Sequence, residues 1–350
     1  MNLSGTFTWS RSGKQAELSK EQQQRLQNVL TDSGLGSVID ELTPDASTRE
    51  FYRIQSGETT LIGCVYAAGD IEGPRQLIDV TDLFVQAGLP VAKVIRDFSD
   101  DGIAILEDLG EVILRDSLLE STPEDREDLI NSAIDLIPRI QSATDIAISS
   151  GSIAGKLRFD REKLLWELNF FKEHYFTSLR GHDLELSIDS AIEAEFSQLA
   201  GWLESHASVL CHRDFHAANL MVRSDGSLAI IDHQDARIGS PAYDLVSLLL
   251  DRITEPPGDA WLDEKITYFL DARSAAGLAA LDKTDYLVEF DHQTVQRCLK
   301  AVGTFSFQSV FRGKHHFEAY IQPMFKVVLR SLERLGKYPN LRQILAAEIR

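Results

Sequence analysis

Residues 209–251 constrain this chain most, because they combine a polar loop, apolar flanks and a hairpin signal in one short segment. The segment reads VLCHRDFHAANLMVRSDGSLAIIDHQDARIGSPAYDLVSLLLD. The apolar residues 220–222 follow the polar loop, and Asp225-Gly226 is a pair that two-residue hairpin turns favour. We therefore expect the chain to leave the loop through one short strand and to return through a second strand to Asp232.

Three side chains of this segment carry oxygen atoms at a spacing typical of phosphoryl transfer: Asp214, Asn219 and Asp232. The Asp-x4-Asn spacing is that of a kinase catalytic loop, and the second aspartate follows the hairpin as a metal-binding aspartate would. Such a reaction needs a carboxylate at the attacking hydroxyl and a few protein oxygens on Mg²⁺. We predict Asp214 as the catalytic residue and Asn219 and Asp232 as the Mg²⁺ ligands.

Two other interpretations of these residues stay open. Aspartate and asparagine side chains also cap backbone amides in buried turns. Alternatively, His212, Asp214 and His216 have a spacing that suits zinc or iron in a hydrolase, with His233 and Asp232 completing the set. The asparagine of the loop would then have no role.

The runs HRDFHxxNLMV and IDHQDA, followed by GxxxYDLVSLL, resemble the aminoglycoside phosphotransferase/choline kinase family. The match is closest to the branch of bacterial anomeric sugar kinases that phosphorylate N-acetylmuramate and N-acetylglucosamine. The resemblance extends to residues 44–53, 104–110 and 160–176. It implies an α+β, bilobal protein-kinase-like fold with its site in the cleft. Residues 1–107 would form a small β-sheet lobe that binds the nucleotide, and residues 108–350 a larger, mostly helical lobe for catalysis and acceptor binding.

The apolar patterns predict elements that agree with this fold. Strands are expected at residues 37–42, 51–55, 59–67, 91–98 and 102–107, and helices at residues 74–87, 123–142, 161–179 and 188–206. A further helix is expected to begin at a capping box of Ser19 and Gln22 and to stop at Gly34. The Gly- and Ser-rich residues 149–155 are expected to form a linker.

The resemblance also implies a nucleotide site. Ser47, Thr48 and Arg49 stand where the family has its phosphate loop, and Glu107 and Leu109 where it has the hinge at the adenine. Typical members also carry a lysine that grips the α- and β-phosphates, but residues 60–68 contain none. We expect Arg49 to replace that lysine.

Four residues are candidates for acceptor binding. Asp235 and Arg237 follow the second aspartate closely, and Glu167 is an acidic residue on an aromatic-rich helix. Arg213 or Arg237 would meet the carboxylate of a muramate. Two further residues are expected to support the loop and not to contact substrate: His212 and Asp244.

Composition narrows the class of protein. The formal net charge of −19 argues against nucleic acid or an anionic membrane as the main partner. The N-terminus lacks the apolar core of a signal peptide, and no apolar run approaches the ~18 residues of a membrane span. The three cysteines are scattered, which indicates a reducing compartment. These features predict a cytoplasmic protein.

We therefore predict a kinase that uses ATP and Mg²⁺ to phosphorylate a hydroxyl of a small molecule, by resemblance an amino sugar at its anomeric position. An aminoglycoside or another small alcohol stays open as the acceptor. From another class, a pseudokinase that binds partners without chemistry also stays open.

Overall fold

The computed structural model describes residues 13–42 and 49–349. These residues form two compact units. The described residues of 1–78 together with 92–109 make the first unit, and those of 79–91 together with 110 onward make the second. Helix α2 (Glu72–Gln86) begins in the first unit and ends in the second. Within the described ranges, no helix is both long and apolar enough to cross a membrane.

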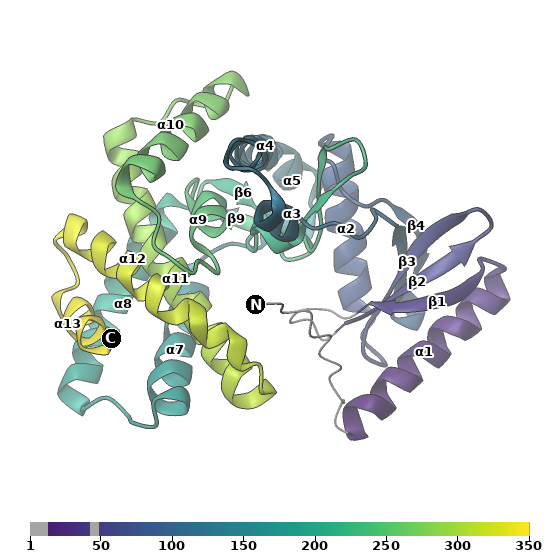
Figure 1. Ribbon diagram of the computed structural model, residues 1–350, viewed down its shortest axis with the longest axis horizontal. Helices are drawn as coiled ribbons and strands as arrows, with labels where there is room; N and C mark the ends of the chain where they lie inside the picture. The colour runs from purple at the N-terminus through teal and green to yellow at the C-terminus, as the bar shows by residue number, and fades with distance from the viewer. Residues whose placement is uncertain (1–12, 43–48, 350) are drawn as a thin grey trace. The chain divides into compact units, whose positions relative to one another are not determined.

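The first unit is built on a five-stranded antiparallel sheet with the strand order β1-β2-β3-β5-β4 (Figure 1). Its strands are β1 (Ser37–Leu42), β2 (Glu50–Ser56), β3 (Thr59–Val65), β4 (Val94–Phe98) and β5 (Ile103–Glu107). The strands predicted from the sequence are therefore confirmed, apart from shifts of a few residues at their ends. Gly57 (φ +62°) and Gly102 (φ +70°) lie in the tight turns, where glycine adopts left-handed backbone without steric cost.

Helix α1 (Gly13–Ser33) packs on this sheet (Figure 1). The prediction that a capping box at Ser19 starts the helix is wrong, because the helix already begins at Gly13. Gln22 is buried and donates from its side-chain amide to the Val65 carbonyl oxygen at 3.3 Å, so this polar residue ties the helix to the sheet. Helix and sheet share one core cluster: Leu26, Leu30, Tyr52, Ile54, Val65, Ile103 and Ile105.

The second unit is mostly helical. Its helices are α3 (Leu114–Glu120), α4 (Pro123–Ser142), α5 (Thr144–Ser150), α6 (Ile153–Lys156), α7 (Arg161–Lys172), α8 (Leu186–His206), α9 (Tyr243–Leu250), α10 (Asp259–Ala275), α11 (Lys283–Arg312), α12 (Ile321–Leu335) and α13 (Pro339–Glu348). Thr122 caps α4, since its hydroxyl oxygen accepts from the Asp125 N–H at 3.2 Å. The N–H groups of a first helical turn have no partner within the helix, and such caps satisfy them.

The linker predicted at residues 149–155 is wrong, because most of these residues lie in α5 and α6. Gly151 ends α5 in a left-handed conformation (φ +73°), and the Ser152 hydroxyl caps α6. A Cβ added to Gly155 would lie 2.3 Å from the Ala147 carbonyl oxygen. Glycine and serine are present here because they permit capping and close packing, and flexibility is not required.

The aromatic-rich helix changes its form along its length. Helix α7 is capped by Asp160, whose Oδ1 accepts from the Lys163 N–H at 2.8 Å. After Lys172 the chain continues as a π-helical segment, η2 (Glu173–Leu179). The helix predicted over residues 161–179 is thus two segments of different pitch.

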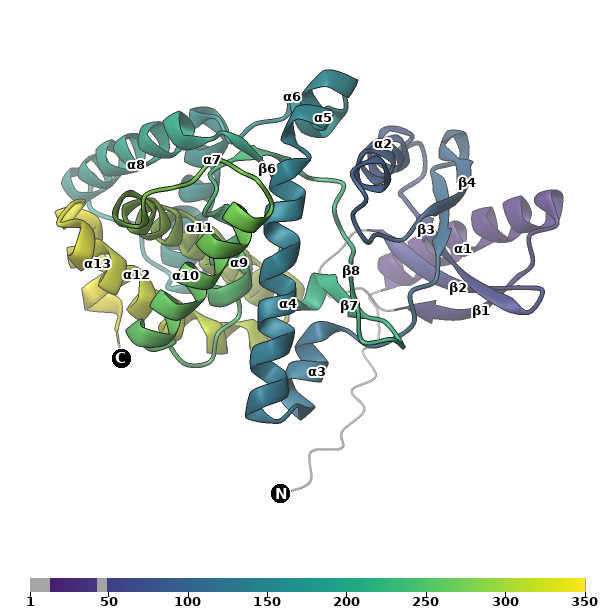
Figure 2. The ribbon, with the colours of Figure 1, turned by 90° about the horizontal axis from the view of Figure 1, so that it is seen from above.

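Helix α11 is 30 residues long and packs against α7, α8, α9 and α12 (Figure 2). Gly303 lies where α11 meets α7. A Cβ at this position would lie 2.7 Å from Phe171 Cα and 2.9 Å from Phe171 N, which is closer than real contacts allow. The absence of a side chain at Gly303 therefore sets how closely the two helices approach.

Gly303→Ala is expected to lower the free energy of unfolding by about 1–3 kcal/mol, because the added methyl group overlaps backbone that cannot retract easily. Gly201→Ala in α8 is the matched control, since a Cβ there meets nothing within 4 Å. That change should leave stability unchanged or raise it slightly. Thermal unfolding of both variants tests this, and equal midpoints would contradict the packing argument.

Candidate active site

Two short sheets of the second unit position the loop of residues 212–219. Strand β6 (Val209–Cys211) enters the loop and pairs with β9 (Arg237–Gly239). Strand β7 (Leu220–Val222) leaves it and pairs with β8 (Leu228–Ile230), as the sequence predicts (Figure 2). The chain thus returns to Asp232 beside the loop.

The hairpin turn itself differs from the prediction. The Arg223 N–H donates to the Ser227 carbonyl oxygen at 2.9 Å, so three residues and not two form the turn. Gly226 takes the left-handed conformation (φ +82°) that a three-residue loop of this kind requires. Asp225 stabilises the turn through its Oδ1, which accepts from the Ser227 N–H at 2.9 Å.

The structure brings Asp214, Asn219 and Asp232 together. The Asn219 Nδ2 donates to the Asp214 carbonyl oxygen at 2.9 Å and lies 3.5 Å from Asp232 Oδ2. A backbone hydrogen bond of 3.1 Å from Ile231 N to the Asn219 carbonyl oxygen joins the loop to the segment that carries Asp232. The carboxylate of Asp232 therefore faces the loop.

Two residues of this region have left-handed backbone although they are not glycine: Arg213 (φ +86°) and Asp232 (φ +61°). Such conformations cost about 1–3 kcal/mol each and persist only where the surroundings enforce them. Each flanks or belongs to the cluster of oxygen-bearing side chains. Among the described residues, Arg252 (φ +54°) and Tyr338 (φ +57°) share this conformation, so two of the four such residues lie at the cluster.

His212 and Asp244 hold the loop from beneath. Asp244 is fully buried, and its carboxylate accepts from the His212 N–H at 2.7 Å and from the Arg213 N–H at 3.0 Å. The His212 Nε2 contacts the Ile231 carbonyl oxygen at 2.9 Å. Burial raises the pKa of Asp244 to about 6, although the two amides and His212 oppose it. Together these contacts tie the loop to α9 and to the segment before Asp232.

Two cations of α11 contact Asp214, and sequence analysis missed both. The Lys300 Nζ lies 2.8 Å from Asp214 Oδ1, and the Arg297 guanidinium lies 3.4 Å from the same oxygen. Arg297 also donates to Asp251 at 2.6 Å and to Ser247 at 2.8 Å. These residues lie 83 and 86 positions after Asp214, so no local spacing could have revealed them.

The charges around Asp214 determine its ionisation. Burial would raise the pKa of this carboxyl, but the cations Lys300, Arg213 and Arg297 outweigh burial and hold the pKa well below its usual range. In turn, burial lowers the pKa of Lys300, and the neighbouring Arg297 adds to this effect. Asp214 is therefore an anion held by fixed cations, with 26% of its side chain exposed.

The acceptor candidates form a second charged group next to Asp214. The Arg213 guanidinium lies 3.1 Å from Asp235 Oδ1, 3.7 Å from Glu167 Oε1 and 3.9 Å from Asp214 Oδ2. Arg237 donates from Nε to the Asp235 carbonyl oxygen at 3.1 Å. Asp235 is the most exposed of them, at 39% of its side chain.

Glu167, a candidate for acceptor binding, is buried and does not face solvent. Its side chain is fully buried, and its Oε2 accepts from the Gln296 side-chain amide at 2.8 Å. A carboxylate without exposed surface does not contact an acceptor. The sequence pattern placed Glu167 among aromatic residues but could not show that it faces inward toward α11.

Of the nucleotide-binding candidates, Arg49, Glu107 and Leu109 lie in the first unit. Ser47 and Thr48 lie outside the described residues. The Arg49 guanidinium lies 5.5 Å from the Phe51 ring centroid and 5.8 Å from that of Tyr66. Glu107 ends β5, and its Oε2 accepts from the Lys93 N–H at 3.3 Å. Leu109 follows and is partly buried.

The hydrolase interpretation needs a cluster of metal ligands. In the part of the chain that the structure describes, no three His, Cys, Asp or Glu side chains are placed to hold a metal ion. The His212 Nε2 lies on a backbone carbonyl oxygen, and the His233 Nε2 lies 2.8 Å from the Thr81 hydroxyl. Burial lowers the pKa of His216 to about 4. The contacts of His212 and His233 give these two residues structural roles.

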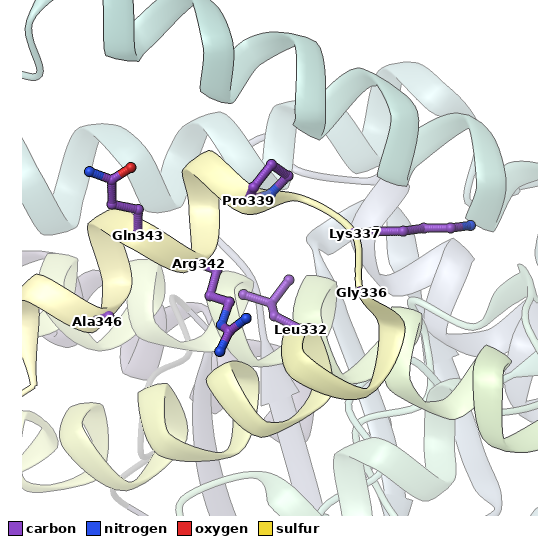
Figure 3. A pocket seen from close by; sticks show the side chains of 7 residues that line it. All are labelled: Leu332, Gly336, Lys337, Pro339, Arg342, Gln343 and Ala346. Carbon is purple, nitrogen blue, oxygen red and sulfur yellow. The ribbon is translucent and has the colours of Figure 1, made fainter.

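A surface pocket between α12 and α13 is lined by other types of side chain than the loop of residues 212–219 (Figure 3). Its lining is Leu332, Gly336, Lys337, Pro339, Arg342, Gln343 and Ala346. It has two cations and no carboxylate, and it includes none of the loop residues. The oxygen cluster of Asp214, Asn219 and Asp232 is the stronger candidate for phosphoryl transfer.

Comparisons with known proteins show the family of this chain. The model of the phosphotransferase enzyme family matches residues 38–282. An N-acetylmuramate/N-acetylglucosamine kinase of Neisseria meningitidis is 30% identical over 304 residues, which cover 86% of this chain and 87% of that protein. A protein of the same name from Pseudomonas aeruginosa is 27% identical, with 87% and 86% covered.

The fold is similar to that of ethanolamine kinase from Plasmodium vivax, with a TM-score of 0.59 at 11% identity, covering 94% of this chain and 96% of that structure. The chain belongs to the phosphotransferase enzyme family, and the predicted α+β kinase-like fold is confirmed. It is accordingly an enzyme that transfers a phosphoryl group to a hydroxyl acceptor.

Proposed function

We propose that this enzyme uses ATP and Mg²⁺ to phosphorylate the anomeric hydroxyl of an N-acetylated amino sugar, N-acetylmuramate or N-acetylglucosamine. The observation that carries the proposal is the convergence of Asp214, Asn219 and Asp232 around one loop. The relatives that bear the names of such kinases match 86% and 87% of this chain, which supports the choice of acceptor.

In this proposal Asp214 receives the hydroxyl of the acceptor and orients it or takes its proton. A carboxylate with a strongly lowered pKa is always ionised but is a weak base. An anomeric hydroxyl suits such a base, because a hemiacetal is more acidic than an ordinary alcohol. The transition state of phosphoryl transfer is loose, so positioning contributes more than proton abstraction.

Asn219 and Asp232 are the proposed ligands of Mg²⁺. They supply an amide oxygen and a carboxylate, the hard oxygen donors that Mg²⁺ prefers, and Mg²⁺ usually takes only one or two protein ligands beside water and phosphate. The Asn219 Nδ2 points at the Asp214 carbonyl oxygen, which leaves the amide oxygen of Asn219 available. When bound, Mg²⁺ would neutralise charge on the transferring phosphates.

Residues 47–49 are proposed to contact the phosphates of ATP, and Glu107 and Leu109 the adenine. Strand β3 contains no lysine, so another cation must balance the phosphate charge. Arg49 carries such a cation immediately before β2 and beside aromatic rings, a setting that tolerates a guanidinium well. Arg53 forms an ion pair with Asp108, with 2.8 Å between Arg53 Nε and Asp108 Oδ2.

For the acceptor we propose contacts from Asp235, Arg237 and Arg213. Asp235 has an exposed carboxylate that can accept hydrogen bonds from sugar hydroxyls. Arg213 and Arg237 hold that carboxylate in place. Glu167, which is buried, is proposed to support Arg213 from behind.

The proposal predicts that the enzyme with ATP and Mg²⁺ converts either sugar into a phosphate that is no longer reducing, because the anomeric hydroxyl is consumed. Asp214→Asn should lower kcat by about 10²–10⁴-fold, with the KM for ATP changed much less. Asp225→Asn, in the exposed hairpin turn, is the control and should retain activity. Steady-state assays over a panel of amino sugars, aminoglycosides, choline and homoserine would decide the acceptor.

Two outcomes would refute parts of this proposal. Phosphorylation of another panel member, without either sugar, would remove the sugar assignment but keep the kinase. Absence of any ATP turnover, in the presence of Mg²⁺, would identify a pseudokinase.

The pH dependence of kcat/KM tests whether Lys300 keeps the Asp214 carboxyl ionised. In the unaltered enzyme the carboxylate should be ionised at all pH values above about 5, so protonation of Asp214 should cause no loss of kcat/KM there. Lys300→Met removes a lowering charge while burial still raises the pKa, so the acid limb of kcat/KM should move to higher pH by about one unit or more. Lys300→Arg should restore it. An acid limb at the same pH in all three proteins would contradict this.

A further inference from the structure

Lys163 lies on the first turn of α7 and is not used by the mechanism above. Its Nζ lies 4.0 Å from the ring centroid of Trp166, a residue that is 55% exposed. The carboxylate nearest to it is Glu167, at 3.9 Å from Nζ to Oε1, which is too long for a hydrogen bond. In the described residues, the ammonium of Lys163 donates no hydrogen bond to a carboxylate.

The other cations of this region are already engaged. Arg213 lies against Asp235, Glu167 and Asp214, and Arg237 lies against Asp235. Lys300 is held on Asp214 at 2.8 Å. Burial lowers the pKa of Lys163, and the positive charges of Arg213, Arg237 and Lys300 lower it further, whereas Glu167 opposes them. An anion added at Lys163 would therefore lie near several cations, of which Lys163 has the most distant carboxylate partner.

A short series of contacts connects Lys163 with the site of transfer. Its ammonium lies near Glu167, the same carboxylate oxygen lies 3.7 Å from Arg213, and Arg213 lies 3.9 Å from Asp214. Lys163 also sits at the N-terminal end of α7, where the helix dipole favours anions. The ammonium is partly exposed, at 26% of the side chain, so a ligand can reach it.

The two proposed acceptors differ by one charged group. N-acetylmuramate is N-acetylglucosamine with a lactyl ether at the 3-position, and that ether ends in a carboxylate. In a chain with a net charge of −19, an acidic acceptor is bound best by a cation that has no close carboxylate partner. Arg213 and Arg237 have a carboxylate oxygen at 3.1 Å and 3.5 Å, whereas the Glu167 carboxylate lies 3.9 Å from Lys163, beyond hydrogen-bond distance.

We propose that Lys163 binds the carboxylate of an acidic amino sugar and thereby sets the preference for it over the neutral amino sugar. The inference rests on the proposed function and names a specificity residue within it. Trp166 lies beneath the ammonium and limits the directions that the lysine side chain can take. Glu167 is fully buried and lies 3.7 Å from Arg213, while 26% of the Lys163 side chain stays exposed for a ligand.

Lys163→Met tests the inference, because it removes the charge and keeps an unbranched apolar stem over Trp166. The KM for N-acetylmuramate should rise about tenfold or more, the loss expected for one charge-assisted hydrogen bond. The KM for N-acetylglucosamine should change by less than about twofold, and kcat should change little for both sugars. Lys163→Arg should keep most of the preference, and Lys163→Glu should reverse it.

Lys172→Met is the matched control, since it removes a lysine from the other end of α7 whose partners are Asp189 and Glu193 on α8. It should leave the ratio of the two KM values unchanged. If Lys163→Met changes that ratio by less than about threefold, Lys163 does not bind the carboxylate and the inference is overturned while the kinase stands. If the unaltered enzyme phosphorylates neither sugar, the proposed function and the inference fall together.

Discussion

The ion pair between Asp214 and Lys300 is the interaction on which the rest of the site depends. It joins a loop between two short sheets to the long helix α11, and Arg297 extends it to Asp251. A buried carboxylate without such partners would bind a proton, because burial disfavours its charged form. Gly303, where α11 approaches α7 closely, lies three residues after Lys300 on the same helix.

Local contacts then give the loop its shape. Asp244 accepts two backbone N–H groups beneath it, and Asn219 connects Asp214 with Asp232. Arg213 and Asp232 hold unfavourable backbone conformations that these contacts enforce. Stability is thus reduced where side chains must converge, which is usual at functional sites. The chain is strongly acidic as a whole, yet cations cluster beside the loop at Arg213, Arg237 and Lys300.

Much of this could be predicted from the sequence, because its signals are local. Apolar patterns revealed the strands and the helix over residues 123–142. The spacing of Asp214, Asn219 and Asp232 revealed residues that the hairpin then brings together. Gly and Ser at 149–155 were misinterpreted, since the same residues that make linkers flexible also permit capping and close packing.

What the sequence could not reveal depends on tertiary contacts. Lys300 and Arg297 lie on a helix 86 and 83 residues beyond Asp214, and no spacing rule connects them. The inward orientation of Glu167 depends on Gln296 of the same distant helix. Lys163 resembles an ordinary surface lysine until its neighbours in space are known.

Asn219 and Asp232 are proposed to hold the metal of a nucleotide next to Asp214. Binding of Mn²⁺ in the presence of ADP, followed by water proton relaxation, tests this proposal without any knowledge of the acceptor. The account predicts that the protein binds Mn²⁺–ADP and that Asp232→Asn weakens this binding at least about tenfold, which corresponds to about 1.4 kcal/mol. Asp225→Asn should have no effect. Equal binding by the unaltered protein and by Asp232→Asn would contradict the account.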